Sequence, residues 1–154
     1  MQKEKKSTEA IKHYLRGAKY YREKADYLSC KIMELRSKAE KTTTSFSDTP
    51  TFGSYEDHRQ VLITEIIEKQ KQYKNAIDNC KNRLQEIQLF IDNLQNYEER
   101  IACEMHYIYF EEWQDVAIRL HYSLRQIHNI HGSALLNLLE IHKKIMENSG
   151  KRLF

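Results

Sequence analysis

Apolar side chains recur at every seventh position along two long stretches of the chain. The first stretch carries ladders that begin at Ile11 and Tyr14, and the second carries ladders that begin at Ile63 and Ile66. Their members are Ile11, Ala18, Ala25, Ile32 and Ala39; Tyr14, Tyr21, Leu28 and Leu35; Ile63, Gln70, Ile77, Leu84 and Ile91; and Ile66, Tyr73, Cys80, Ile87 and Leu94. A sustained seven-residue repeat is typical of helices that supercoil left-handed around a partner. The pattern therefore predicts two long coiled-coil helices.

A loop near residues 42–57 is expected to separate these helices. The segment KTTTSFSDTPTFGSYEDH contains Pro50, Gly53 and many Thr and Ser residues, which interrupt a helical pattern. Two rods joined by one loop fold back most simply as an antiparallel hairpin. We therefore expect residues 1–96 to form a helical hairpin that also serves in oligomerisation.

Further apolar residues flank the predicted contact between the two helices. They are Leu62, Ala76 and Phe90 with Ile67 on the second helix, and Tyr20 and Tyr27 on the first. An isolated hairpin would leave these side chains in water. Two interpretations stay open, because the flanking residues can pack on the rest of the chain or can join two or more hairpins. The second interpretation is favoured and predicts a homodimer or homotetramer.

After Leu94 the pattern shortens into three helical segments. They read NYEERIACEMHYIYF, EEWQDVAIRLHY and SLRQIHNIHGSALLNLLEIHKKIMENSG. Ser123 and Gln126 have the spacing of a capping box, in which each side chain bonds a free backbone N–H at a helix start. His121 and Tyr122 then form the turn. A short helix, a tight turn and a second helix make a helix-turn-helix, which we expect in residues 97–154.

Helical geometry divides the last segment into two faces. At about 100° per residue, the inward face holds Ile127, Ile130, His131, Ala134 and Leu138, and the outward face holds Arg125, Asn129 and Gly132. Between Asp115 and Glu140 the chain has two arginines and three histidines but no acid. The DNA major groove admits one helix, presents acceptors to Arg, and presents a donor and an acceptor to Asn or Gln.

The outward face therefore predicts a set of DNA contacts. Base contacts are expected from Arg125, Gln126 and Asn129. Phosphate contacts, which position a protein without reading sequence, are expected from Arg119, Tyr122, Ser123, His128 and Ser133. Trp113 and His131 are expected in the core. The alternative is that this polar face is simply solvated, or that it binds a protein.

Composition narrows the class of protein without identifying a partner. Four glycines and one proline in 154 residues favour an all-α fold, and a formal net charge of +3 is too small to imply an anionic partner. Three cysteines at scattered positions are typical of reduced thiols in a cytosolic protein. We expect no membrane segment, since no stretch reaches about 18 consecutive apolar residues.

Motifs for catalysis and metal binding are missing from the sequence. It contains no glycine-rich phosphate loop, no HExxH and no GxSxG. His128 and His131 diverge on a helix, and no Cys or carboxylate lies at a spacing that would complete a zinc site. We therefore expect no enzymatic activity, no cofactor and no metal.

The segment ERIACEMHYIYFEEWQDVAIRLHYSLRQIHNIHGSALLNL resembles the sigma factor region 4-like helix-turn-helix of small phage and prophage regulators, the RinA and ArpU type of late transcription regulators. The matching positions are Tyr107, Trp113, Val116, Ala117, Leu120, Tyr122, Ser123, Ile127, His131, Ala134 and Leu135. Such modules commonly have Gly and then Ser or Thr before the second helix, where this chain has Phe110 and Glu112. The resemblance implies a DNA-binding regulator in the bacterial cytoplasm that activates late phage genes.

Two functions from different classes follow. The first is a sequence-specific transcription regulator that binds double-stranded DNA as an oligomer, with the helix that begins at Ser123 in the major groove. The second is a coiled-coil interaction protein that docks on RNA polymerase or another protein without reading DNA. Salt dependence distinguishes them, since binding through phosphates weakens steeply as salt rises.

Overall fold

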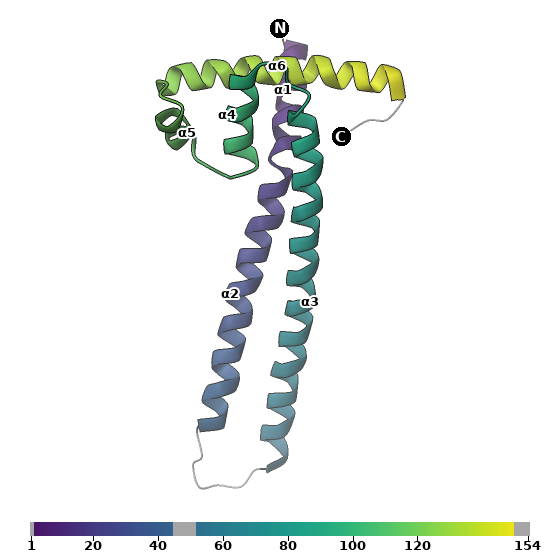
Figure 1. The fold of residues 1–154 in the computed structure, drawn as a ribbon. Helices are drawn as coiled ribbons and strands as arrows, with labels where there is room; N and C mark the ends of the chain where they lie inside the picture. The colour runs from purple at the N-terminus through teal and green to yellow at the C-terminus, as the bar shows by residue number, and fades with distance from the viewer. Residues whose placement is uncertain (1, 45–51, 150–154) are drawn as a thin grey trace. The chain divides into compact units, whose positions relative to one another are not determined.

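The computed structural model describes residues 2–44 and 52–149 of the chain. These residues form six helices, which Figure 1 labels in chain order. The helices are α1 (Gln2–Leu15), α2 (Gly17–Thr44), α3 (Phe52–Ile91), α4 (Tyr97–Tyr107), α5 (Trp113–Arg119) and α6 (Leu124–Ser149). No strand occurs in the described ranges. The predicted all-α class is confirmed.

The predicted loop near residues 42–57 is longer than the interval between α2 and α3 in the structure. Helix α2 continues to Thr44 and α3 begins at Phe52, so residues 42–44 and 52–57 are helical. Thr and Ser are only weakly unfavourable in a helix, and an established helix extends through a few of them at its end. Residues 45–51, with Pro50, lie outside the described residues.

The first predicted helix is interrupted at Arg16, which the seven-residue pattern did not indicate. Helix α1 ends at Leu15 and α2 begins at Gly17, and the Lys19 N–H donates to the Arg16 carbonyl three residues back at 3.0 Å. A Cβ atom on Gly17 would lie 2.7 Å from Nε of Arg83. That guanidinium covers the ring of Tyr14 at 4.1 Å from its centroid. A side chain at position 17 would therefore require the guanidinium of Arg83 to shift.

The chain divides into two compact units. Unit 1 comprises residues 1–20 and 81–154, and unit 2 comprises residues 21–80. The sequence placed a boundary at residues 96 and 97, after the hairpin. The structural division differs because α1 and the last turns of α3 share a core with α4 and α6. As a division of function, the boundary at 96 and 97 remains a prediction.

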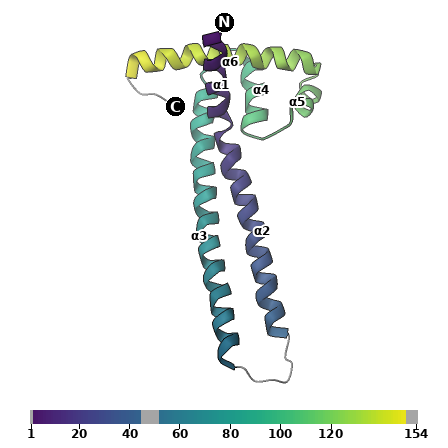
Figure 2. The same cartoon turned by 180° about the vertical axis from the view of Figure 1, so that it is seen from behind.

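Helix α6 is the centre of unit 1. It packs against α1, α4 and α5, which Figures 1 and 2 show from opposite sides. The largest core cluster contains Ile11, Tyr14, Leu15 and Ala18; Ile87, Phe90, Ile91 and Leu94; Cys103 and Tyr107; and Ala134, Leu135, Leu138 and Leu139. A helix that is held on several sides has a fixed position within its unit, so α6 presents its remaining face on a firm support.

Unit 2 has a much smaller core, built on small side chains. Ala25 and Leu28 of α2 form a buried cluster with Ala76 of α3. Two of these three side chains are alanines, so the cluster buries little apolar surface. Within unit 2, α2 and α3 run antiparallel (Figure 1). The supercoil itself remains a prediction.

One predicted contact ladder of α3 is wrong in its first half, although its last member, Ile91, is buried. The sequence placed Ile63, Gln70 and Ile77 against the first helix, but Ile63 is 44% exposed and Ile77 is 42% exposed. The flanking residues Leu62 and Ala76 are buried instead. Ala76 therefore lies on the side of α3 that packs with Ala25 and Leu28, whereas Ile63 and Ile77 lie on a side that faces solvent.

Candidate nucleic-acid interface

The turn between α5 and α6 is closed by backbone hydrogen bonds. The Tyr122 N–H donates to the Ala117 carbonyl at 2.9 Å, and the His121 N–H donates to the Ile118 carbonyl at 3.2 Å. Together these two bonds form a Schellman motif, which ends a helix with one residue in the left-handed region. That residue is His121, with φ of 58°. The direction of the chain into α6 is thus set by the backbone.

The start of α6 has the capping box that the sequence predicted. The Gln126 N–H donates to Oγ of Ser123 at 3.3 Å, and the Ser123 N–H donates to Oε1 of Gln126 at 2.9 Å. The Ser123 hydroxyl also donates to the same Oε1 at 2.8 Å. This prediction is confirmed. Its consequence is that the Gln126 side chain is held against the helix end, and only its Nε2 group remains to meet a partner.

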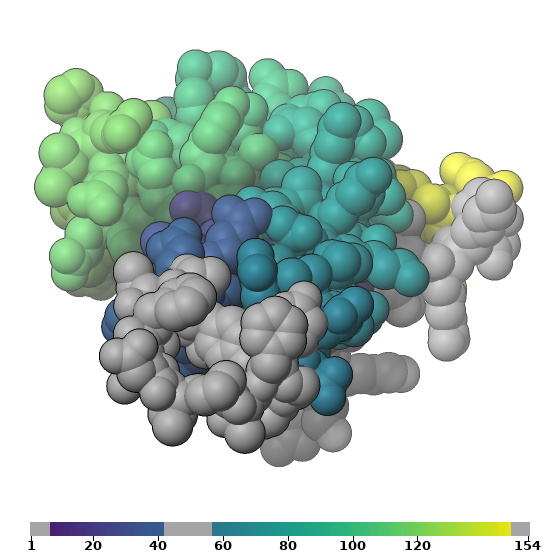
Figure 3. All heavy atoms as spheres, turned by 90° about the horizontal axis from the view of Figure 1, so that it is seen from below, coloured from purple at the N-terminus to yellow at the C-terminus, as the bar shows by residue number. Residues whose placement is uncertain are grey.

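A second apolar cluster fixes α6 from behind. Its fully buried members are Ala102, Val116, Ala117 and Ile127, and Met105, Trp113, Leu120, Tyr122 and Ile130 pack against it. In the space-filling view α4 and α5 form one continuous surface (Figure 3). The inward face predicted for residues 127–138 is confirmed, since Ile127, Ala134 and Leu138 are fully buried. Trp113 belongs to this packing, as expected.

The loop before α5 contains Phe110 and Glu112, the two residues at which the sequence departs from the resembling modules, and the cap of α5 there is weak. Phe110 has φ of 60°, in the region that favours glycine. Glu112 caps α5 without any side-chain hydrogen bond to the helix start. The His106 ring, which forms a hydrogen bond through Nδ1 to the Glu111 carbonyl at 2.7 Å, holds the loop from the other side.

The outward edge of α6 is open. Arg125, His128, Asn129 and Gly132 are all exposed. Within the described part of the chain, the Arg125 and Asn129 side chains form no hydrogen bond or ion pair. Two of the three predicted base contacts therefore have free hydrogen-bonding groups, and the third, Gln126, has part of its capacity free.

The predicted phosphate contacts are more occupied than the sequence suggested. Nε of Arg119 lies 3.2 Å from Oε2 of Glu111, although this arginine is 66% exposed. The Tyr122 hydroxyl donates to Oε1 of Glu98 at 2.6 Å, and this bond raises the pKa of Tyr122. Ser123 is engaged in the capping box. Among the described residues, neither ring nitrogen of His128 forms a hydrogen bond. Its ring lies edge-on to Trp113, with 6.0 Å between the ring centroids.

Glu99 is a buried carboxylate that sequence reasoning missed. It is 4% exposed and accepts hydrogen bonds from the Ser133 hydroxyl at 2.5 Å and from Nδ2 of Asn137 at 2.7 Å. These donors lie one turn apart on α6, so Glu99 joins α4 to α6 at two points. The hydroxyl of Ser133, predicted to contact phosphate, is thus already committed. The only sequence signal was the four-residue spacing of two hydrogen-bonding side chains on one side of the helix.

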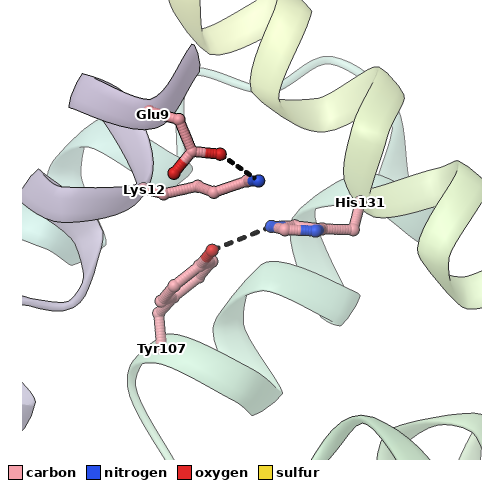
Figure 4. A network of polar contacts seen from close by, with 4 residues as sticks. All are labelled: Glu9, Lys12, Tyr107 and His131. Atoms are coloured by element: carbon pink, nitrogen blue, oxygen red, sulfur yellow. Dashed lines mark hydrogen bonds and ion pairs between the residues drawn. The ribbon is translucent and has the colours of Figure 1, made fainter. Parts of the chain in front are cut away.

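His131 is a core histidine, as predicted. It is 8% exposed, and its Nε2 shares a hydrogen bond of 2.8 Å with the hydroxyl of Tyr107 (Figure 4). The indole of Trp113 lies 4.5 Å from its ring centroid. Burial, followed by the nearby positive charges, lowers the pKa of His131 from 6.5 to about 4. Lys12, which is paired with Glu9 at 2.7 Å in the same view, is one of those charges. His131 is therefore neutral at neutral pH.

Comparisons with known proteins identify no relative of this chain. No family model, no curated protein and no solved structure matches this chain. In the described ranges no three His, Cys, Asp or Glu side chains gather in a way that could hold a metal ion. None of the described helices combines the length and apolar character that crossing a membrane requires.

Proposed function

We propose that this chain is a sequence-specific DNA-binding regulator in which α5, the turn and α6 act as a helix-turn-helix. The observation that carries the proposal is the outward edge of α6, where Arg125 and Asn129 are exposed with uncommitted hydrogen-bonding groups. The edge lies directly after a turn closed by the backbone and on a helix packed from three sides. Side chains on such a support meet a groove with little loss of conformational freedom.

In this proposal each residue has a distinct role. Arg125 donates to O6 and N7 of a guanine, and Asn129 pairs with N6 and N7 of an adenine. Gln126 adds one donor through Nε2, because its oxygen is used in the capping box. His128 provides a contact to the phosphates, and so does Arg119, which is 66% exposed although it pairs with Glu111. Tyr122 and Ser133 must first leave their carboxylate partners, and Ser123 must leave the capping box. The resemblance to phage regulators adds to this proposal that the genes regulated are late phage genes.

Oligomerisation belongs to the proposal because one helix reads few base pairs. Each good bidentate contact contributes about 1–3 kcal/mol of discrimination, so useful specificity calls for two half-sites. Unit 2 supports association through an exposed stripe of α3, where Ile63, Ile67 and Ile77 are 44%, 60% and 42% exposed. An apolar stripe of this kind is covered when a second hairpin packs on it.

The test begins by selecting, from a randomised duplex library, the sequence that the wild-type protein retains. Arg125→Ala should then weaken binding to that duplex about 10- to 100-fold and relax preference at one base pair, as measured by fluorescence anisotropy. Arg36→Ala, which removes an exposed arginine of α2 in unit 2, is the matched control and should bind as the wild type does. Equal affinity and equal base preference in the folded Arg125→Ala protein would reject the proposed reading helix.

A second function, docking on RNA polymerase or another protein, is favoured by one specific observation. Three apolar side chains, Ile118, Leu124 and Leu136, are 72%, 38% and 52% exposed on α5 and α6. Exposed apolar residues beside polar ones are characteristic of protein interfaces. The salt series separates the two functions. DNA affinity should fall by about 0.9 log units per log unit of salt for each phosphate contacted. Failure to retain any duplex at low salt would favour the docking function.

A further inference from the structure

Gly132 occupies a position for which the packing of the protein gives no reason. It lies well inside α6, between Leu124 and Ser149, and its backbone is not in the left-handed region. Apart from its chain neighbours and the adjacent backbone of α6, a Cβ atom added there would meet no atom within 4 Å. Glycine is the least favourable helix residue after proline, because it loses the most backbone entropy on folding. Alanine would therefore fit better if only the folded chain mattered.

The position of Gly132 on α6 indicates what it accommodates. Arg125, Asn129, Gly132 and Leu136 follow one another at intervals of three or four residues and so lie along one side of the helix. Seven residues separate Arg125 from Gly132, which is about 10 Å along the axis. The major groove is about 12 Å wide. With Arg125 over the base edges, Gly132 lies where the helix leaves the groove and passes one of its sugar–phosphate walls.

The charge of this stripe agrees with DNA as the neighbour. The sequence has no Asp or Glu between Asp115 and Glu140, and the nearby Glu99 of α4 is buried beneath Ser133 and Asn137. An exposed carboxylate at this point would repel a phosphate. From Arg125 to Gly132 the stripe instead offers an arginine, an amide and a bare length of helix backbone.

We propose that Gly132 is the point of closest approach between α6 and the DNA backbone, where a side chain would hold the helix away from the groove. This inference rests on the proposed function and adds a steric requirement to it. The contact is made by the helix surface itself, and its role is to let Arg125 and Asn129 reach the bases. Gly132 is thus a positioning residue rather than a reading residue.

Gly132→Ala separates folding from binding, because the two are expected to change in opposite directions. Its melting temperature should rise by about 2–4 °C, since alanine favours the helix and has open space around it. Its affinity for the selected duplex should fall about tenfold, and Gly132→Leu should lose more. Asn75→Ala, at an exposed position of α3 in unit 2, is the matched control, because it also improves helix propensity and should leave DNA affinity unchanged.

The outcomes distinguish this inference from the proposed function. A Gly132→Ala protein that is more stable and binds the duplex as the wild type does would overturn the close approach, while a loss of binding in Arg125→Ala would still support the reading helix. A wild-type protein that retains no duplex would contradict both the close approach at Gly132 and the proposed DNA-binding function. A change in sedimentation with unchanged DNA affinity would assign Gly132 to a protein contact instead. Failure of Gly132→Ala to fold would contradict the open space on which the inference depends.

Discussion

The two units of this chain use similar apolar sequences with different results. Unit 1 buries large side chains completely, among them Ile11, Ile87, Ile127 and Leu138. Unit 2 has a buried cluster of Ala25, Leu28 and Ala76, while Ile67 is 60% exposed. Both contain regular apolar ladders. The difference is that several helices surround α6, whereas α2 and α3 have only each other within unit 2. Burial therefore depends on how many partners a helix has, as well as on its own pattern.

The largest expected effect compares the same substitution in the two units. Ile127→Ala should lower the free energy of unfolding by about 2–5 kcal/mol, because it leaves a cavity in a fully buried site. Ile67→Ala should change it by less than about 0.5 kcal/mol in dilute protein. Urea unfolding followed by the fluorescence of Trp113, which belongs to unit 1, and by circular dichroism measures both. A cost for Ile67→Ala that grows with protein concentration would show that the exposed stripe is an interface.

The second effect is a loss of stability at acidic pH, caused by His131 in unit 1. The pKa of His131 is about 4 in the folded protein against an ordinary value of 6.5, so the unfolded chain binds the proton more readily. The stability due to neutral His131 is complete above about pH 6.5 and is lost as the pH falls toward 4. The full loss is on the order of 3 kcal/mol.

His131→Gln isolates this contribution, because glutamine can still bond the Tyr107 hydroxyl but does not titrate. Between pH 6.5 and 5 the wild-type free energy of unfolding should fall more steeply than that of the variant. His106 lies near and also has a lowered pKa, chiefly through burial, so part of the slope should remain. Parallel slopes for the two proteins would show that His131 is accessible to protons in the folded state.

The third effect compares two adjacent carboxylates within unit 1. Glu99→Ala should cost about 1–3 kcal/mol of unfolding free energy, because Ser133 and Asn137 lose a buried acceptor. Glu98→Ala removes only an exposed bond to Tyr122 and should cost less than about 1 kcal/mol. Thermal unfolding of both variants measures the difference. Equal costs would mean that burial adds nothing to the bonds of Glu99.

The smallest effect is a gain of stability in the turn. His121→Gly should raise the free energy of unfolding by about 0.5–1 kcal/mol, since glycine adopts positive φ without strain. His128→Gly, at an exposed position inside α6, should lower it by a similar amount. Chemical unfolding of the two variants should therefore show changes of opposite sign in the free energy of unfolding. Loss of stability in His121→Gly would point to a favourable contact of the imidazole in the turn.

Local signals predicted most of the α5, turn and α6 region. The capping box of Ser123 and Gln126 and the inward face around Ile127 depend on residues close together in sequence, so spacing alone was sufficient. The bond from Ser133 to Glu99 joins residues far apart in the chain, and no local pattern contains it. The same holds for the contact of Gly17 with Arg83, which comes from another helix. On α3 the adjacent apolar ladders look equivalent in the sequence, and only the structure shows that Leu62 and Ala76 are buried while Ile63 and Ile77 are exposed.

In the proposed function, helix α6 has its packing residues and its DNA-reading residues on opposite sides. Its inner side is fixed by the apolar clusters of unit 1, while Arg125 and Asn129 contribute nothing to that packing. Exchanges at these two positions therefore leave the fold intact while they alter which chemical groups the helix offers. A lineage of such chains could acquire new recognition preferences one substitution at a time, without a compensating change in the interior.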